Sequence, residues 1–192
     1  MEQLNWEAPD YIAISVGDGC TIAGLWKGLK DLYAIGFIDR LPRLISAQAA
    51  GCCPINRAIE EGADWRPMEE NTFADSIAVG VPRNPDKALQ AIRESQGLVV
   101  NVSDQEIMDA QQLLGRTCGV FGEPAGVTGT AGVKKLCEQG LLGKEDTVVS
   151  VVTGNGLKDV ANAIKACGEP IAIPGTMDAL LAAFAARQVV VS

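Results

Sequence analysis

The chain has 192 residues, enough for one domain whose core needs neither a metal ion nor disulfide bonds to be stable. Its 24 acidic and 16 basic residues give a formal net charge of −8, which disfavours binding to the phosphate backbone of nucleic acids. Histidine is absent from the chain, which excludes Ser-His or Cys-His nucleophile pairs and His-ligated metal sites within it.

The cysteines and the apolar segments indicate the compartment. The six cysteines form no C-x-x-C motif, and the N-terminal residues lack the basic and then apolar layout of a signal peptide. The longest apolar run, Ala179–Ala186, is far shorter than the roughly 20 residues that span a bilayer. We therefore expect a soluble cytoplasmic protein with reduced thiols and no membrane contact.

The first third of the chain alternates strand and helix patterns. Tyr11–Val16 is a continuous apolar run, typical of a strand buried on both faces. Thr21–Ile35 has apolar residues at helical spacing, and Gly36 follows in the usual helix-terminating position. Arg43–Gln48 is predicted to be the next strand, and a short helix is expected over Pro54–Glu61.

The middle of the chain opens with a long irregular connection, Gly62–Val81, rich in proline and acidic residues. A helix with proline at its start is then expected over Pro85–Ser95, followed by a strand at Leu98–Val102. The sequence S-D-Q-E at the start of Ser103–Leu114 is a capping box, which predicts that a helix begins there.

The last third continues the alternation. The predicted elements are a small strand at Gly119–Phe121, a helix at Ala125–Gln139, the clearest core strand at Thr147–Val152, a further element at Leu157–Cys167, a strand-like stretch at Ile171–Ile173 and a helix at Met177–Arg187. Mostly apolar strands separated by helices indicate a parallel sheet covered on both sides. We therefore predict one α/β domain over residues 1–192, a three-layer α/β/α structure with a mostly parallel sheet.

Ligands of open parallel sheets bind beyond the carboxyl ends of the strands. The first predicted strand ends in Gly17, Asp18, Gly19, Cys20 and Thr21, directly before a helix. Glycine turns and a helix N-terminus together can hold a phosphate group, although an ordinary strand-to-helix turn has the same composition. The dinucleotide and Walker fingerprints are both incomplete here. The Asp18 carboxylate would oppose an anion unless it points away and caps the helix.

Two further strand ends carry polar residues. Thr153 follows the predicted strand at Thr147–Val152, and Glu123 precedes a predicted helix. Each has an ordinary structural explanation, a turn hydroxyl for Thr153 and an acid that complements the helix dipole for Glu123. Lys158 is predicted to lie on the surface near a helix start. Five helical lysines are expected to extend into solvent: Lys27, Lys30, Lys134, Lys135 and Lys165.

Stretches spread over nearly the whole chain resemble, in order, the motifs of one family. They are residues 16–21 (V-G-D-G-C-T), 38–43 (I-D-R-L-P-R) with 48–51 (Q-A-A-G), 103–107 (S-D-Q-E-I), 122–125 (G-E-P-A) and 153–159 (T-G-N-G-L-K-D). The family counterparts are V-G-N-A-G-N, I-D-R-L-P-R with Q-A-A-G, V-S-D-E-E-I, F-V-E-P-A and L-T-G-H-G-L-K-D. The chain thus resembles the C-terminal part of the threonine synthase family, pyridoxal-phosphate enzymes with the tryptophan synthase β-subunit fold.

The resemblance implies a cofactor, pyridoxal 5'-phosphate, and residues that bind it. The N–H groups from Gly17 to Thr21 would hold its phosphate, and Thr153 would bond to its pyridine nitrogen. Glu123 would lie near the site. The implied reaction converts O-phosphohomoserine and water to threonine and phosphate, in an enzyme that is expected to be a homo-oligomer such as a dimer. Asp18, Cys20 and Thr21 depart from the family's commonest loop residues.

The family's Schiff-base lysine lies in an S-F-K-D-R-type motif upstream of these stretches, and the chain contains no such motif. We therefore expect that the catalytic lysine and the small substrate-binding domain would precede Met1, and that the isolated chain is inactive. One alternative is a related lyase, such as a cysteate synthase or an ammonia-lyase. Another is a non-catalytic binding or interaction fragment that needs a partner chain, with exposed apolar surface that favours self-association.

Overall fold

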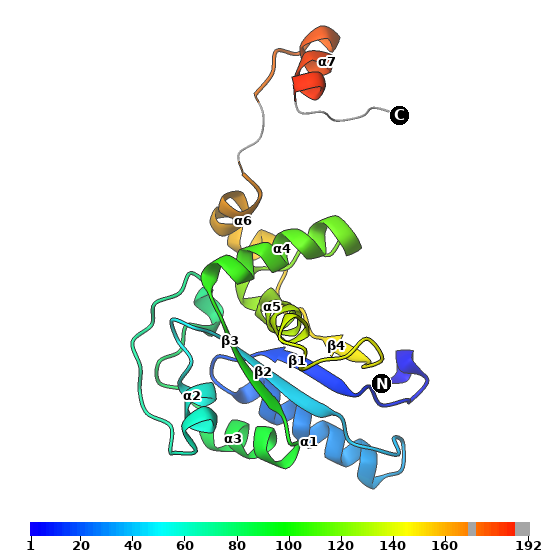
Figure 1. Ribbon diagram of the computed structural model, residues 1–192, viewed down its shortest axis with the longest axis vertical. Coiled ribbons are helices and arrows are strands. Elements are labelled where there is room, and N and C mark those ends of the chain that lie inside the picture. Colours follow the sequence, from blue (N-terminus) through cyan, green and yellow to red (C-terminus); the bar gives the residue numbers. More distant parts are fainter. Residues whose placement is uncertain (169–171, 187–192) are drawn as a thin grey trace.

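A parallel sheet with helices on both faces forms the framework of the chain (Figure 1). The computed structural model describes residues 1–168 and 172–186. The strands are β1 (Tyr11–Ser15), β2 (Arg43–Ala49), β3 (Leu98–Val102) and β4 (Val148–Ser150). The helices are α1 (Cys20–Ala34), α2 (Pro54–Glu61), α3 (Pro85–Glu94), α4 (Asp104–Cys118), α5 (Pro124–Glu138), α6 (Val160–Cys167) and α7 (Met177–Ala186).

The strand order in the described sheet is β3-β2-β1-β4, and every neighbouring pair is parallel. Alternate residues of β1 enter two separate cores. Ile12 and Ile14 pack with α1, α2 and α3, whereas Tyr11 and Ala13 pack with α4 and α5. This alternation follows from the two-residue period of a strand, and it confirms the predicted sheet covered on both faces.

Most predicted elements are confirmed within one or two residues, and the bounds of α2 and β3 match those expected. The predicted strand Gly119–Phe121 is wrong. Helix α4 continues to Cys118 and ends at Gly119, whose φ of 67° is left-handed, so these residues leave the helix instead of joining the sheet. Nearby, Gly122 forms only an isolated bridge to Asn155.

The C-terminal third also differs from expectation. Strand β4 has three half-buried residues, because it lies at the edge of the described sheet and pairs only with β1, so it is not the core strand that was predicted. The expected element Leu157–Cys167 is a 3-10 turn, Gly156–Asp159, followed by α6. Ile171 and Arg187 lie outside the described residues, and the described remainder of Ile171–Ile173 is not a strand.

The expected exposed apolar surface is present beside β4. Apolar side chains from α1, from β4 and from the residue after it line a groove of about 560 Å³, among them Leu25, Leu32, Val149 and Val151. Self-association through such a surface stays a prediction. In the described part of the chain, no helix combines the length and the apolar character needed to cross a bilayer.

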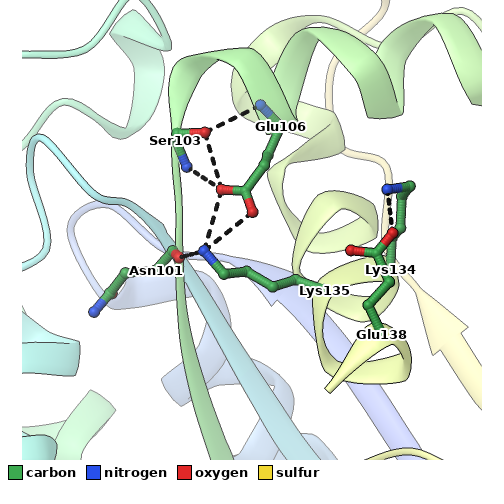
Figure 2. Close-up of polar contacts among 6 residues, drawn as sticks. All are labelled: Asn101, Ser103, Glu106, Lys134, Lys135 and Glu138. Atoms are coloured by element: carbon green, nitrogen blue, oxygen red, sulfur yellow. Dashed lines mark hydrogen bonds and ion pairs between the residues drawn. The ribbon is translucent and has the colours of Figure 1, made fainter. Parts of the chain in front are cut away.

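A lysine on α5 fastens this helix to the C-terminal end of β3 (Figure 2). Lys135 Nζ donates to the Asn101 carbonyl oxygen at 2.9 Å and to the Glu106 carboxylate at 3.1 Å. The predicted capping box is confirmed, since Ser103 and Glu106 exchange bonds across the first turn of α4. Lys135, predicted to extend into solvent, is only 30% exposed. The cluster therefore joins β3, α4 and α5.

Loss of the Lys135 ammonium group should destabilise the chain more than loss of the ammonium group of the neighbouring Lys134. We expect Lys135→Met to lower the free energy of unfolding by about 1 kcal/mol, because two charge-assisted bonds are lost. Lys134 pairs with Glu138 at 2.5 Å on the exposed face of the same helix. Lys134→Met is the matched control and should cost about 0.3 kcal/mol. Urea unfolding of both variants measures the difference, and equal losses would contradict the fastening role of Lys135.

A carboxylate on α3 makes the chain sensitive to acid. Glu94 accepts bonds from Lys30, Trp26 and Gln90, which in that order of effect lower the pKa of Glu94 to about 2. A carboxyl whose pKa is lower in the folded state stabilises the fold above its unfolded pKa and loses this effect as the pH falls. For Glu94 this stabilising effect is lost as the pH falls from 4.5 to about 2.

The melting temperature of Glu94→Gln should therefore fall less than that of the parent chain over this window. Glu145→Gln, at an exposed position, is the matched control and should follow the parent chain. Melting curves at stepped pH measure both. If the melting temperature of Glu94→Gln falls with pH as steeply as that of the parent chain, Glu94 is not a source of acid sensitivity.

Candidate functional site

The turn between β1 and α1 is built around glycine. Gly19 is the N-cap residue of α1 and has a φ of 83°, a left-handed conformation that favours glycine. A Cβ atom on Gly19 would lie 2.7 Å from the Asn84 carbonyl oxygen and 2.8 Å from the Ala88 Cβ. One on Gly17 would lie 2.9 Å from the Ile77 Cα. The turn therefore passes close to the start of α3 and to the 75–77 segment.

The N–H groups of this turn are available to a ligand. In the described part of the chain, none of the backbone N–H groups from Gly17 to Thr21 donates a hydrogen bond to a protein acceptor. The first N–H groups of a helix have no partner within the helix, and the helix dipole adds partial positive charge there. Residues 17–21 therefore present several unpaired donors at the start of a helix, a combination that suits an anion.

The Asp18 side chain is directed away from these donors. Its Oδ1 accepts a hydrogen bond from the Arg83 N–H at 3.1 Å, and its carbonyl accepts one from the Asn84 N–H at 2.9 Å. The Arg83 guanidinium lies 3.8 Å from the same carboxylate. Asp18 does not cap α1. It instead fastens the turn to the residues before α3, and part of its charge is balanced there.

Buried polar groups support the turn from below. Gln48, at the end of β2, donates from Nε2 to the Val16 carbonyl at 3.2 Å, and its Oε1 accepts the Asn56 N–H in the first turn of α2 at 2.8 Å. The Asn56 side chain bonds to Ser46, to the Val100 carbonyl and to Asn101. These contacts connect three strands and α2 directly beneath the residue that precedes Gly17.

The turn forms one wall of a cavity of about 240 Å³. The other walls come from Ser76 and Ile77, from Glu123 and Ala125 at the start of α5, and from Thr153 after β4. The structure thus gathers around one cavity every residue that the sequence singled out: Gly17, Asp18, Gly19, Cys20, Thr21, Glu123 and Thr153. They meet because the carboxyl ends of parallel strands share one edge of the sheet.

Glu123 lies deep in this cavity, and only 3% of its surface is exposed. It is the N-cap residue of α5 but makes no side-chain capping bond, so it is not a simple helix-dipole acid. Its carboxylate instead accepts a hydrogen bond from Lys158 Nζ at 3.1 Å. A Cβ on Gly154 would lie 1.9 Å from the Glu123 Oε1, so the turn after β4 packs directly on this carboxylate.

Thr153 lines the cavity from the segment that follows β4. It is exposed, and its hydroxyl makes no hydrogen bond to the residues that the structure describes. Strand β4 pairs with β1, so the ends of both strands face the same cavity. The hydroxyl is therefore free to bond a polar ligand atom.

The sequence did not indicate that three further residues contribute to the site. Ser76 and Ile77 belong to a 3-10 turn, Asp75–Ile77, within the connection that was predicted to be irregular. Lys158 was correctly expected at the surface, since its side chain is 59% exposed, but its ion pair with Glu123 was not foreseen. No local pattern indicates contacts between residues so far apart in the chain.

The residues present fit pyridoxal 5'-phosphate. The glycine turn packs closely on its neighbours and lines the cavity, and its unpaired N–H groups supply donors for the phosphate. Thr153 offers a hydroxyl on the same cavity for a ring atom. Ser15, at the end of β1, is satisfied by the Gly129 N–H and the Gly126 carbonyl, so it shapes the wall without competing for the ligand.

Comparisons with known proteins identify the family of the chain. A family model described as "Pyridoxal-phosphate dependent enzyme" matches residues 1–154. The threonine synthase of Methanocaldococcus jannaschii is 42% identical over 181 residues, which cover 93% of this chain and 45% of that protein. The threonine synthase of Methanosarcina acetivorans is 41% identical over 181 residues, with the same coverage of 93% and 45%. The chain thus spans less than half the length of these curated relatives.

Solved structures share the fold. Maize serine racemase matches with a TM-score of 0.64 and 21% identity, covering 85% of this chain and 47% of that chain. The processed form of threonine deaminase isoform 2 from Solanum lycopersicum matches with a TM-score of 0.64 and 20% identity, covering 84% and 45%. At such identities the likeness concerns the fold alone.

Proposed function

Because this chain belongs to the family of pyridoxal-phosphate dependent enzymes, we propose that its cavity binds pyridoxal 5'-phosphate. The observation that carries the proposal is the set of unpaired N–H groups from Gly17 to Thr21 at the start of α1. A phosphate dianion there would accept several hydrogen bonds and meet the positive end of the helix dipole. Asp18 does not oppose it, because its carboxylate bonds to Arg83.

The ring of the cofactor would extend from the turn toward Thr153. In this arrangement the Thr153 hydroxyl bonds the pyridine nitrogen and, unlike a carboxylate, leaves it largely unprotonated. When bound, the cofactor supplies an electron sink that stabilises carbanions, and a neutral ring nitrogen restrains this sink and favours elimination and replacement at the β and γ carbons. Glu123 lies on the same cavity, paired with Lys158.

We propose further that the full enzyme is of the threonine synthase type, converting O-phosphohomoserine and water to threonine and phosphate. The support is the 42% and 41% identity to curated threonine synthases over most of this chain. The racemase and deaminase structures share only the fold, at about half that identity, so they do not favour a related lyase. An amino-acid substrate and a homodimer belong to the same proposal.

The 192-residue chain by itself should bind the cofactor without catalysing this reaction, because it contains no S-F-K-D-R-type lysine motif. Incubation of the purified chain with cofactor and O-phosphohomoserine should release no threonine. Cofactor-dependent threonine formation by the pure chain would show that a lysine of this chain suffices.

The reaction is tested on the full-length gene product by comparing phosphate release from O-phosphohomoserine with turnover of serine and threonine. We expect the phosphorylated substrate to be strongly preferred. Equal or faster turnover of a non-phosphorylated amino acid would rule out the threonine synthase assignment and leave the cofactor assignment standing.

A further inference from the structure

Three chain segments that line the cavity meet at one ammonium group. Lys158 follows Thr153 in the turn after β4, and its Nζ lies 3.1 Å from both carboxylate oxygens of Glu123. The same Nζ donates to Ser76 Oγ at 2.9 Å. Glu123 and Ser76 are cavity-lining residues 35 and 82 positions away in the chain. Lys158 therefore joins the start of α5, the 75–77 turn and the turn that carries Thr153.

The ion pair matters because one of its members is buried. The Glu123 side chain is 4% exposed, and Lys158 is the only cationic group that pairs with it in the described part of the chain. A buried carboxylate that loses its cationic partner keeps its desolvation penalty and must move toward water or take up a proton. The position of Glu123, and of the segment that packs on it, therefore depends on Lys158.

The turn after β4 transmits this constraint to Thr153. The Gly154 carbonyl accepts the Glu123 N–H at 2.9 Å, and the Gly156 N–H donates to the Phe121 carbonyl at 2.9 Å. Asn155 Oδ1 accepts the Leu157 N–H at 2.9 Å within the turn. These bonds make residues 153–158 one connected unit. Lys158 fixes its far end against the buried carboxylate.

We propose that Lys158 is a positioning residue, which holds Thr153 at the ring end of the cavity in register with the 75–77 turn, the segment that packs on Gly17. The part of this inference that concerns pyridoxal 5'-phosphate rests on the function proposed above. The connection between the three segments does not rest on it. Two independent measurements therefore separate the two claims.

Hydrogen–deuterium exchange of the ligand-free chain tests the connection. In Lys158→Met, amide exchange in peptides covering 72–80 and 152–160 should rise about tenfold, as expected when a tertiary tie that limits local opening is lost. Peptides covering 26–36, which contain no residue of the cavity, should exchange as in the parent chain. Lys144→Met removes an exposed lysine outside the cavity and is the matched control. Unchanged exchange in both wall peptides of Lys158→Met would overturn the proposal.

The affinities for two ligands then test whether Lys158 affects binding in the cavity. Inorganic phosphate probes the 17–21 turn alone, and pyridoxal 5'-phosphate probes both ends of the cavity. Lys158→Met should weaken binding of the cofactor about tenfold and that of phosphate clearly less, because only the cofactor would reach Thr153. Lys158→Arg, which can bridge the same two oxygen-bearing groups, should restore most of the cofactor affinity.

The outcomes are distinguishable. Equal cofactor affinity in Lys158→Met and the parent chain would overturn the positioning role, and so would equal losses for both ligands, which indicate general damage. If the parent chain binds phosphate but no cofactor, the proposed function fails. The exchange experiment still decides in that case whether Lys158 joins the three segments.

Discussion

Asn56→Leu is expected to lower the free energy of unfolding by about 3 kcal/mol, because it leaves several buried polar groups without partners. Asn56 is fully buried, and its side chain bonds to Ser46 Oγ at 2.6 Å and to the Val100 carbonyl at 3.0 Å, among other partners. Leucine branches at Cγ as asparagine does but is larger, so overpacking of the buried position adds to the loss of hydrogen bonds. Equilibrium unfolding in urea, followed by tryptophan fluorescence, measures it.

The control for this variant is Asn71→Leu, at an exposed asparagine in the long connection before α3. Its effect should stay below about 0.5 kcal/mol. The Asn56 variant should also weaken phosphate binding, since Gln48 would then lose its rigid neighbour beneath Val16. A stability loss similar to that of the control would mean that the buried polar groups find other partners.

Gly19→Val is expected to remove most phosphate binding, weakening it by about a hundredfold or more, which corresponds to about 2.7 kcal/mol. The φ of 83° at this position is a strained conformation for a β-branched residue. The new Cβ would also lie 2.7 Å from the Asn84 carbonyl oxygen, a backbone atom that cannot turn aside. The turn must therefore open, which displaces the N–H groups of residues 17–21.

Gly24→Ala is the matched glycine control on the same helix. No atom lies within 4 Å of a Cβ at this position, so alanine should leave binding unchanged and stabilise the helix by about 0.5–1 kcal/mol. Isothermal titration with inorganic phosphate, combined with melting curves, separates binding from folding. Parent-like phosphate affinity in folded Gly19→Val would contradict the role assigned to the turn.

Local patterns predicted the framework well. The continuous apolar run of β1, the proline at the start of α3 and the capping box of α4 act within a few residues, and the structure confirms all three elements. The error at Gly119–Phe121 has a local cause as well. Helix α4 continues to Cys118, and the predicted strand wrongly began at Gly119, a residue typical of a helix end.

The candidate site was predictable where it follows the strand ends and not where it depends on long connections. Thr153 and the 17–21 turn meet because β1 and β4 are parallel neighbours. Ser76 reaches the same cavity through a connection without strong periodicity, and its contact with Lys158 spans 82 positions. Burial of Glu123 is likewise a tertiary effect, since its sequence neighbours suit an ordinary exposed helix start.

Titration of the purified 192-residue chain with pyridoxal 5'-phosphate tests most directly whether residues 17–21 form a phosphate site. We predict saturable binding that inorganic phosphate displaces, that Gly19→Val abolishes and that borohydride does not convert to a covalent adduct by intact mass. Absence of saturable binding, or binding that phosphate cannot displace and that borohydride fixes to a lysine, would contradict this assignment.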